Sequence, residues 1–300
     1  MVKQGLQLFG GDWTEQKLEA LRQYLAAYAK VLSKQKYERV YVDAFAGTGY
    51  REKQTGPLDS YAQIFGEEEG LAGQEVQLFL DGSPPIALRV VPPFHRFVFV
   101  ELRKEKAREL ERLKQSFPER AASIDVRRGD ANLTIRELCR TWDRGRSRGV
   151  LFLDPFGMQV EWSAIQAIAG TRAIDVWILF PFAVNRLLTK DPKDIPSAWR
   201  KRLNDIFGSD EWAKRFYKER TIEDMFSGSE TVVEKALTLK GLGAYYHERL
   251  QTVFPIVAPN PRVLRNSRNS PLFQLFFAAA NPGKGGEIAV KIAQHILREI

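Results

Sequence analysis

Short runs of β-branched and aromatic residues alternate with longer amphipathic stretches through the N-terminal half of the chain and somewhat beyond it. The short runs, too short for helices, lie at 39–42, 76–80, 97–100, 124–126, 150–153 and 174–180. The amphipathic stretches, with apolar residues at spacings of three and four, lie at 13–32, 107–117, 135–142 and 162–168. Strands that alternate with such helices predict a parallel sheet covered on both faces.

The C-terminal part of the chain changes character twice. From about 185 to 250 the strand pattern disappears, and apolar residues spaced as in helices predict a helical insertion. Two later runs, 253–264 and 272–280, flank a polar stretch and predict an antiparallel hairpin at the sheet edge. This is the layout of class I methyltransferases, an analogy of fold alone. We therefore expect one α/β domain over 1–300, with a doubly wound, mainly parallel sheet of seven strands, an antiparallel C-terminal hairpin and a helical insertion at about 185–250.

Composition and charge limit the surroundings and the partners of the chain. No stretch approaches the roughly 20 apolar residues of a membrane span, and no signal-peptide pattern opens the sequence. The single cysteine, Cys139, excludes an internal disulfide, so we expect a cytoplasmic protein with no membrane contact. The formal net charge of +8 favours a polyanionic partner such as nucleic acid. A solvated basic surface is the alternative explanation of this charge.

A glycine turn follows the first predicted strand, at Asp43-Ala44-Phe45-Ala46-Gly47-Thr48-Gly49. A ligand that crosses a strand end needs backbone without side chains, as Gly47 and Gly49 provide. Glu52 stands where a dinucleotide fingerprint requires Gly or Ala, and no phosphate-binding loop with Lys-Ser or Lys-Thr is present. S-adenosylmethionine carries no phosphate, and its ammonium favours a carboxylate such as that of Asp43. The candidate cofactor-binding residues here are Asp43, Phe45, Ala46, Gly47 and Gly49.

Acidic residues end or follow three further predicted strands. Glu101 ends an apolar strand and is suited to accept hydrogen bonds from both ribose hydroxyls, although an insertion at about 50–95 separates it from the glycine turn. Asp130 is placed to face an adenine amino group, with Ala131 beside the ring, and Asp154 ends the strand 150–153. Each acid alone suggests a solvated strand end or a helix cap. Together with Asp43 they favour a methyl-donor site.

Several of these motifs together resemble the three-Cys-motif partner family, a group of methyltransferase-like proteins, over nearly the whole chain. The matching stretches are Tyr41 to Gly49, Gly82-Ser83-Pro84, Gly129-Asp130-Ala131-Asn132, Leu153-Asp154-Pro155-Phe156-Gly157 and Arg265 to Phe273. The resemblance implies binding of S-adenosylmethionine and association with a separate protein that carries the three cysteines. It implies no particular substrate.

The acceptor side of the predicted site is less defined. Asp154-Pro155 is similar to the motif of amino-methyltransferases that act on adenine or guanine, so Asp154, Pro155 and Phe156 are the candidate catalytic residues. Asp154 would accept the amino hydrogens while Phe156 stacks on the base or enters the core. Those enzymes continue with a second proline or polar residue and then an aromatic, whereas this chain has Phe156 and Gly157. Methylation of a base is therefore one alternative among several.

Three basic residues are weaker candidates for substrate or partner binding. Lys17 would reach the cofactor carboxylate or the substrate, although a solvated helix face is the favoured alternative. Arg265 and Arg268 would bind phosphate or would be ordinary turn residues. The three histidines are far apart without metal-ligand spacing, so we expect no metal. Basic helices that carry Arg200, Lys201, Arg202, Lys214 and Arg215 are a possible substrate or partner surface.

Two functional hypotheses follow from these residues. The first is an S-adenosylmethionine-dependent methyltransferase that acts on a nucleic acid or nucleotide-like substrate together with the three-cysteine partner. The second is a non-catalytic module of the same fold that binds that partner. A nicotinamide enzyme is disfavoured by Glu52.

Overall fold

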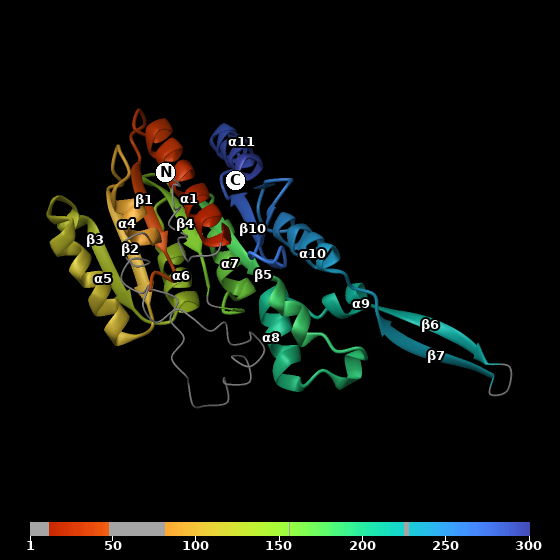
Figure 1. Cartoon of the computed structure of the whole chain (residues 1–300). Coiled ribbons are helices and arrows are strands. Elements are labelled where there is room, and N and C mark those ends of the chain that lie inside the picture. The colour runs from red at the N-terminus through yellow and green to blue at the C-terminus, as the bar shows by residue number, and fades with distance from the viewer. Residues whose placement is uncertain (1–11, 48–81, 156, 225–227) are drawn as a thin grey trace, which may run out of the picture.

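A central sheet organises the chain, which a computed structural model describes over residues 12–47, 82–155, 157–224 and 228–300 (Figure 1). Five parallel strands form most of this sheet, in the order β3-β2-β1-β4-β5. Their bounds are β1 Glu38–Asp43, β2 Arg96–Glu101, β3 Ile124–Arg128, β4 Ser147–Leu153 and β5 Ile174–Pro181. The predicted strand at 76–80 lies outside the described residues. All five strands end at one edge of the sheet, because they run parallel.

Antiparallel strands complete the sheet beside β5. β10 (Pro271–Ala279) pairs with β5, while β8 (Ile256–Val257) and β9 (Arg262–Arg265) both pair with β10. The predicted hairpin is thus confirmed as β9 and β10. Among the described residues the sheet has eight strands, because the strand expected over 253–264 is divided into two. Pro259 and Pro261 lie between β8 and β9 and lack the N–H that a continuous ladder requires.

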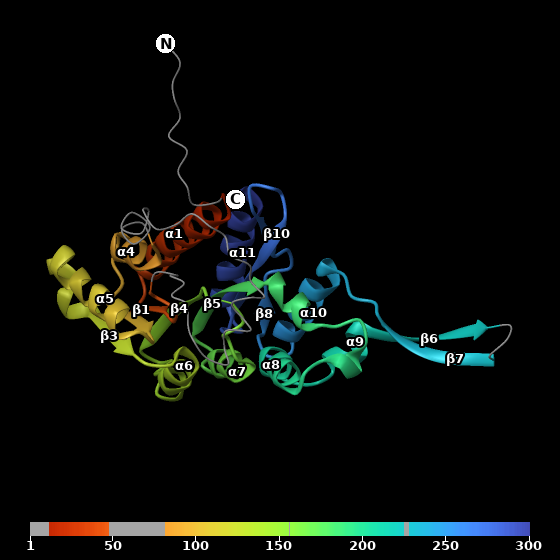
Figure 2. The same ribbon diagram turned by 60° about the horizontal axis from the view of Figure 1, so that its bottom comes forward.

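Helices cover both faces of the sheet, as the doubly wound prediction requires (Figure 2). Alternate residues of β1 enter different cores: Val40 and Val42 pack on one side and Tyr41 on the other. The first core includes residues of α6 Ala131–Arg140, α7 Trp162–Gly170, α8 Ser197–Phe207 and α10 Leu239–Gln251. The second includes residues of α1 Asp12–Leu32, α4 Ser83–Leu88, α5 Lys104–Ser116 and α11 Lys284–Glu299.

The insertion predicted to be helical contains a β-hairpin, so that prediction was wrong in part. The segment begins with the short 3₁₀ turns Phe182–Leu187 and Pro192–Asp194, continues through α8 and α9 (Trp212–Phe216), and ends in α10. Between α9 and α10 lie β6 (Tyr217–Asp224) and β7 (Gly228–Lys235), paired in a separate two-stranded sheet. Their sequences mix charged residues with β-branched ones and contain no continuous apolar run, which is why the strand pattern was missed.

Within the described ranges, no helix combines the length and the apolar character that crossing a membrane would require.

A glycine at the end of α8 provides a test of the packing between the insertion and α7. Gly208 has φ of 75°, and a Cβ there would lie 2.0 Å from Cδ1 of Trp162 on α7. Gly208→Ala should therefore lower the free energy of unfolding by about 2–4 kcal/mol, from strain at positive φ and from overpacking. The measurement is urea unfolding followed by circular dichroism.

Gly170→Ala is the matched control, since a Cβ at this last residue of α7 would meet no atom within 4 Å. It should raise stability by up to about 1 kcal/mol. Equal effects of the two substitutions would contradict the proposed contact between Gly208 and Trp162.

Candidate functional site

The chain that leaves β1 passes between the ends of β2 and β4. The N–H of Ala44 donates to the carbonyl of Phe152 on β4 at 3.2 Å, and the N–H of Ala46 donates to the carbonyl of Val100 on β2 at 3.0 Å. These two bonds hold the beginning of the predicted glycine turn against the sheet. Phe45 and Ala46, two of the predicted cofactor-binding residues, thus lie at the carboxyl ends of β2 and β4. Thr48 and Gly49 lie outside the described residues.

Glu101, the last residue of β2, lies directly against this turn. A Cβ on Gly47 would be 1.5 Å from Oε2 of Glu101, so a side chain at position 47 would displace this carboxylate. The other oxygen, Oε1, accepts a hydrogen bond from the N–H of Arg103 at 2.7 Å. The structure therefore brings together Gly47 and Glu101, which the sequence selected separately.

Two exposed leucines flank the same strand end and were missed by the sequence analysis. Leu102, directly after Glu101, is 61% exposed, and Leu133, in the first turn of α6, is 55% exposed. Large exposed apolar side chains beside a polar strand end are suited to cover a flat apolar ligand face. Their position directly after Glu101 and three residues after Asp130 was the available signal, but an isolated leucine carries little information in a sequence.

Asp130 caps the helix that follows β3. Its Oδ1 accepts a hydrogen bond from the N–H of Leu133 at 2.9 Å, so the helix-cap alternative is confirmed. The side chain is exposed at the same edge as Glu101, and Ala131 behind it is buried. Contact of Asp130 and Ala131 with an adenine ring stays a prediction.

Asp43 is completely buried beneath the turn. Oδ1 accepts from the N–H of Phe45 at 3.3 Å and Oδ2 accepts from the hydroxyl of Tyr41 at 3.2 Å, while the Ser83 side chain adds a further hydrogen bond. Burial raises the pKa of Asp43 to about 7, and the nearby negative charge of Asp154 contributes to this rise. With partners from the protein itself, Asp43 holds the turn in place. A direct bond from Asp43 to a ligand ammonium stays a prediction.

Lys17 and Asp154 form a partly buried ion pair between α1 and the end of β4. The distance between Nζ and Oδ2 is 2.5 Å, and the two side chains are 9% and 22% exposed. Nζ also lies 4.7 Å from the ring centroid of Trp13, which itself contacts Phe273 on β10. The favoured expectation for Lys17, a solvated helix face, was wrong, because α1 packs on the sheet with Lys17 turned toward the strand ends.

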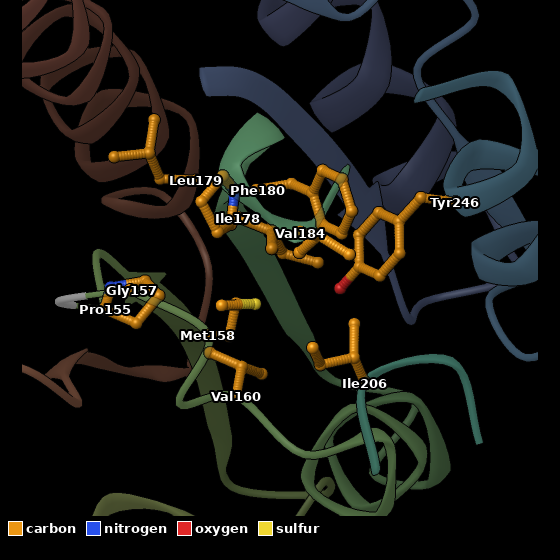
Figure 3. Close-up of a pocket in the computed structure, with 11 residues that line it drawn as sticks. Pro155, Gly157, Met158, Val160, Ile178, Leu179, Phe180, Val184, Ile206 and Tyr246 are labelled. Carbon is orange, nitrogen blue, oxygen red and sulfur yellow. The ribbon is translucent and has the colours of Figure 1, made fainter. Parts of the chain in front are cut away.

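Beyond Asp154 the chain borders a small apolar pocket (Figure 3). Pro155, Met158 and Val160 lie on one side, and Ile206 of α8 and Tyr246 of α10 lie on another. The cavity volume is about 20 Å³, room for about one water molecule. It is therefore too narrow to admit a substrate as it stands. Phe156, the third candidate catalytic residue, lies outside the described residues.

The turn between β9 and β10 lies at the same edge, because Phe273 at the start of β10 pairs with Pro181 at the end of β5. Nη1 of Arg265 donates to the carbonyl of Asn269 at 2.8 Å, and the N–H of Arg268 donates to Oδ1 of Asn266 at 3.1 Å. These bonds show both residues within a structured turn. Phosphate binding by Arg265 and Arg268 stays a prediction.

Acidic, histidine and cysteine side chains do not gather into a metal-binding group of three anywhere in the described part of the chain. Cys139 is largely buried, and burial raises the pKa of its thiol to about 12, which makes it a poor nucleophile.

Comparison with known proteins gives distant structural similarities only. No protein-family model and no curated protein matches the chain. Among solved structures, protein LPL1258 from Legionella pneumophila is similar over 97% of this chain and 92% of its own, with 14% identity and a TM-score of 0.43. Spermidine synthase from Thermotoga maritima is similar over 91% of this chain and 60% of its own, with 13% identity and a TM-score of 0.33. A putative rRNA-methylase from Clostridium thermocellum is similar over 70% of this chain and 95% of its own, with 9% identity and a TM-score of 0.30.

The strand order carries more weight than these distant similarities. A sheet in the order β3-β2-β1-β4-β5, with the antiparallel β10 beside β5, is the arrangement of class I methyltransferase-like folds. The fold class expected from the sequence is thus confirmed. Membership in the three-Cys-motif partner family stays a prediction.

Removal of the Lys17 charge tests the ion pair. Lys17→Met leaves Asp154 without its partner in a mostly buried position and should cost about 1–3 kcal/mol of unfolding free energy. The double variant Lys17→Met/Asp154→Asn should recover most of the loss. As a control, Arg22→Met breaks an exposed pair with Glu19 on the same helix and should cost about 0.5 kcal/mol or less. Equal costs for Lys17→Met and Arg22→Met, measured by urea unfolding, would contradict the interpretation.

The raised pKa of Asp43 predicts a pH dependence of stability. The folded state holds this proton up to about pH 7, while the unfolded chain releases it near 3.8. Unfolding free energy should therefore fall as pH rises from 4 to 7, by at most about 1.4 kcal/mol per pH unit for this group. Asp43→Asn should make this decrease in unfolding free energy less steep.

Asp175 is buried, accepts a hydrogen bond from Tyr24 and has a pKa that burial raises to about 7. It should add its own contribution to the decrease, so Asp175→Asn should also make the decrease less steep. Unchanged slopes in both variants, from urea titrations across this range, would refute this assignment.

Proposed function

We propose that the chain binds S-adenosylmethionine at the carboxyl edge of the sheet and transfers its methyl group to an acceptor beside Asp154. The contact of the Glu101 carboxylate with Gly47 carries this proposal. A carboxylate can accept hydrogen bonds from both ribose hydroxyls of the cofactor, and this one lies against a turn residue that has no side chain. The class I methyltransferase-like strand order supports the same assignment.

The residues around this contact fit the chemistry of the cofactor. Glu101 is suited to the ribose hydroxyls, and Leu102 and Leu133 offer apolar surface for the adenine ring beside Asp130. The Glu101 carboxylate occupies the space beside Gly47, so a ligand at this turn would meet the carboxylate and the backbone together. Bound S-adenosylmethionine would supply an activated methyl group. The protein would contribute mainly by alignment and by exclusion of water, which needs neither histidine nor metal.

Asp154 and Lys17 would shape the acceptor side. Oδ2 of Asp154 is engaged by Lys17, while the carboxylate remains at the end of β4, where an acceptor can approach. The net charge of +8 supports a nucleic acid or nucleotide-like acceptor. On the resemblance alone, we further propose that a three-cysteine partner protein takes part in the reaction.

The ion pair also supports a second candidate function, a non-catalytic module that binds the three-cysteine partner. An acceptor amine would have to share Asp154 with Lys17, and the neighbouring pocket has a volume of only about 20 Å³. Under this alternative the cofactor site would be retained without transfer.

Binding of the cofactor product tests the proposal directly. Saturating S-adenosylhomocysteine should raise the melting temperature of the protein, because a ligand that binds only the folded state stabilises it. Glu101→Gln should abolish most of this shift, since an amide cannot accept hydrogen bonds from two hydroxyls through both of its terminal atoms. Glu105→Gln, on the exposed first turn of α5, is the matched control and should keep the full shift. A wild-type protein without any shift would refute cofactor binding.

Transfer of labelled methyl groups to total cellular RNA, DNA and protein, with and without the partner, separates the two functions. Label in one of these fractions that depends on Glu101 supports the enzyme. Cofactor binding without label in any fraction supports the binding module.

A further inference from the structure

The hairpin of β6 and β7, here called the arm (217–235), leaves the body of the molecule between α9 and α10. Each strand has eight residues, paired antiparallel from Tyr217 opposite Lys235 to Asp224 opposite Gly228. Figures 1 and 2 both show the arm extending away from the central sheet. At about 3.3 Å per residue, its strands reach roughly 25 Å from their base.

The base of the arm is fastened to the body. The hydroxyl of Tyr217 donates to the carbonyl of Thr189 at 2.8 Å, and Nζ of Lys235 donates to the carbonyl of Leu188 at 2.8 Å. Val233 packs against the core that contains α8 and α10. The direction in which the arm leaves the body is therefore set by specific contacts at its base.

Beyond this base the arm is incomplete as a sheet. Within the described residues, β6 and β7 pair only with one another, so each has an open edge. Lys218, Glu219, Arg220 and Glu234 are exposed. An isolated two-stranded hairpin is at best marginally stable in water, and open edges are suited to contact another chain. Eight paired residues per strand are therefore best explained by a second surface against which the arm lies.

The charge of the arm indicates what kind of surface it contacts. The arm contains three basic and five acidic residues, whereas the preceding segment 182–216 contains eight basic and five acidic residues. The arm is thus an acidic element of a chain with a net charge of +8. This charge disfavours nucleic acid and favours a basic protein surface, and a second copy of the same chain supplies such a surface.

We propose that the arm docks on a second copy of this chain, in a two-fold dimer where each protomer lends its arm to the other. A two-fold contact is reciprocal, so the surface that receives the partner's arm is the same on both copies. Its place in this proposal is beside the base of the arm, where the basic residues of α8 and α9 include Arg200, Lys201, Lys214 and Arg215. This dimer is independent of the methyl-transfer proposal, since neither Glu101 nor Gly47 takes part in it.

Sedimentation velocity over micromolar to several hundred micromolar protein tests the proposal. The full chain should sediment as a monomer–dimer equilibrium. A variant in which Asn-Gly replaces residues 220–232 keeps the base contacts and joins Glu219 to Val233, which are paired across the strands, through a two-residue turn. This variant should remain monomeric throughout. A monomeric full chain, a dimeric trimmed variant, or assemblies that grow beyond dimers would each overturn the proposal.

Charge reversal gives a test that leaves the arm intact. Glu219→Lys/Glu223→Lys changes two acids that stand opposite the uncharged residues Val233 and Ser229 in the strand register. This variant should weaken the dimer at least about tenfold, and added salt should weaken the wild-type dimer. Glu105→Lys/Glu119→Lys, an equal charge change at two exposed acids outside the arm, should leave the dimer unchanged. Equal dimer dissociation constants for the wild type and the charge-reversed variant would overturn the proposal. This test does not depend on whether the trimmed variant folds.

Discussion

The position of β1 between two parallel neighbours is the constraint on which the candidate site depends. Because β1 pairs with both β2 and β4, the chain that leaves it must cross the ends of both strands. Backbone hydrogen bonds from Ala44 to β4 and from Ala46 to β2 fix this crossing. Gly47 then meets the Glu101 carboxylate, with 1.5 Å between Oε2 and the place of a Cβ. An interior strand of a parallel sheet thus determines where ligand chemistry can occur.

Two carboxylates, those of Asp43 and Asp154, and the ammonium of Lys17 lie close together at the strand ends. Asp43 is fully buried and Asp154 is 22% exposed, and the negative charge of Asp154 disfavours ionisation of Asp43. Lys17 reaches Asp154 from α1 and partly offsets this repulsion, while Tyr41, Ser83 and the N–H of Phe45 satisfy Asp43. The hydrogen bonds to Asp43 and the ion pair of Lys17 with Asp154 offset part of the free-energy cost of burying these groups.

The insertion between β5 and α10 serves a different region of the molecule. Its helices pack on the same core as α6 and α7, whereas its arm leaves the body and carries excess acidic residues. Separation of a basic body from an acidic arm produces complementary surfaces within one chain. Self-association and methyl transfer would then rest on different elements, joined only through the packing of α8 and α10 against the sheet.

The sequence by itself determined the alternation of strands and helices, the terminal hairpin and the residues at the strand ends, because periodicity and glycine turns are local properties. It could not show that Lys17 is buried, since its partner Asp154 lies 137 residues away. It missed Leu102 and Leu133, which gain meaning only from their place beside Glu101, and it missed the arm, whose strands lack a continuous apolar run. Only the tertiary structure decided these points, because charge pairing, exposure and strand pairing depend on which distant segments meet.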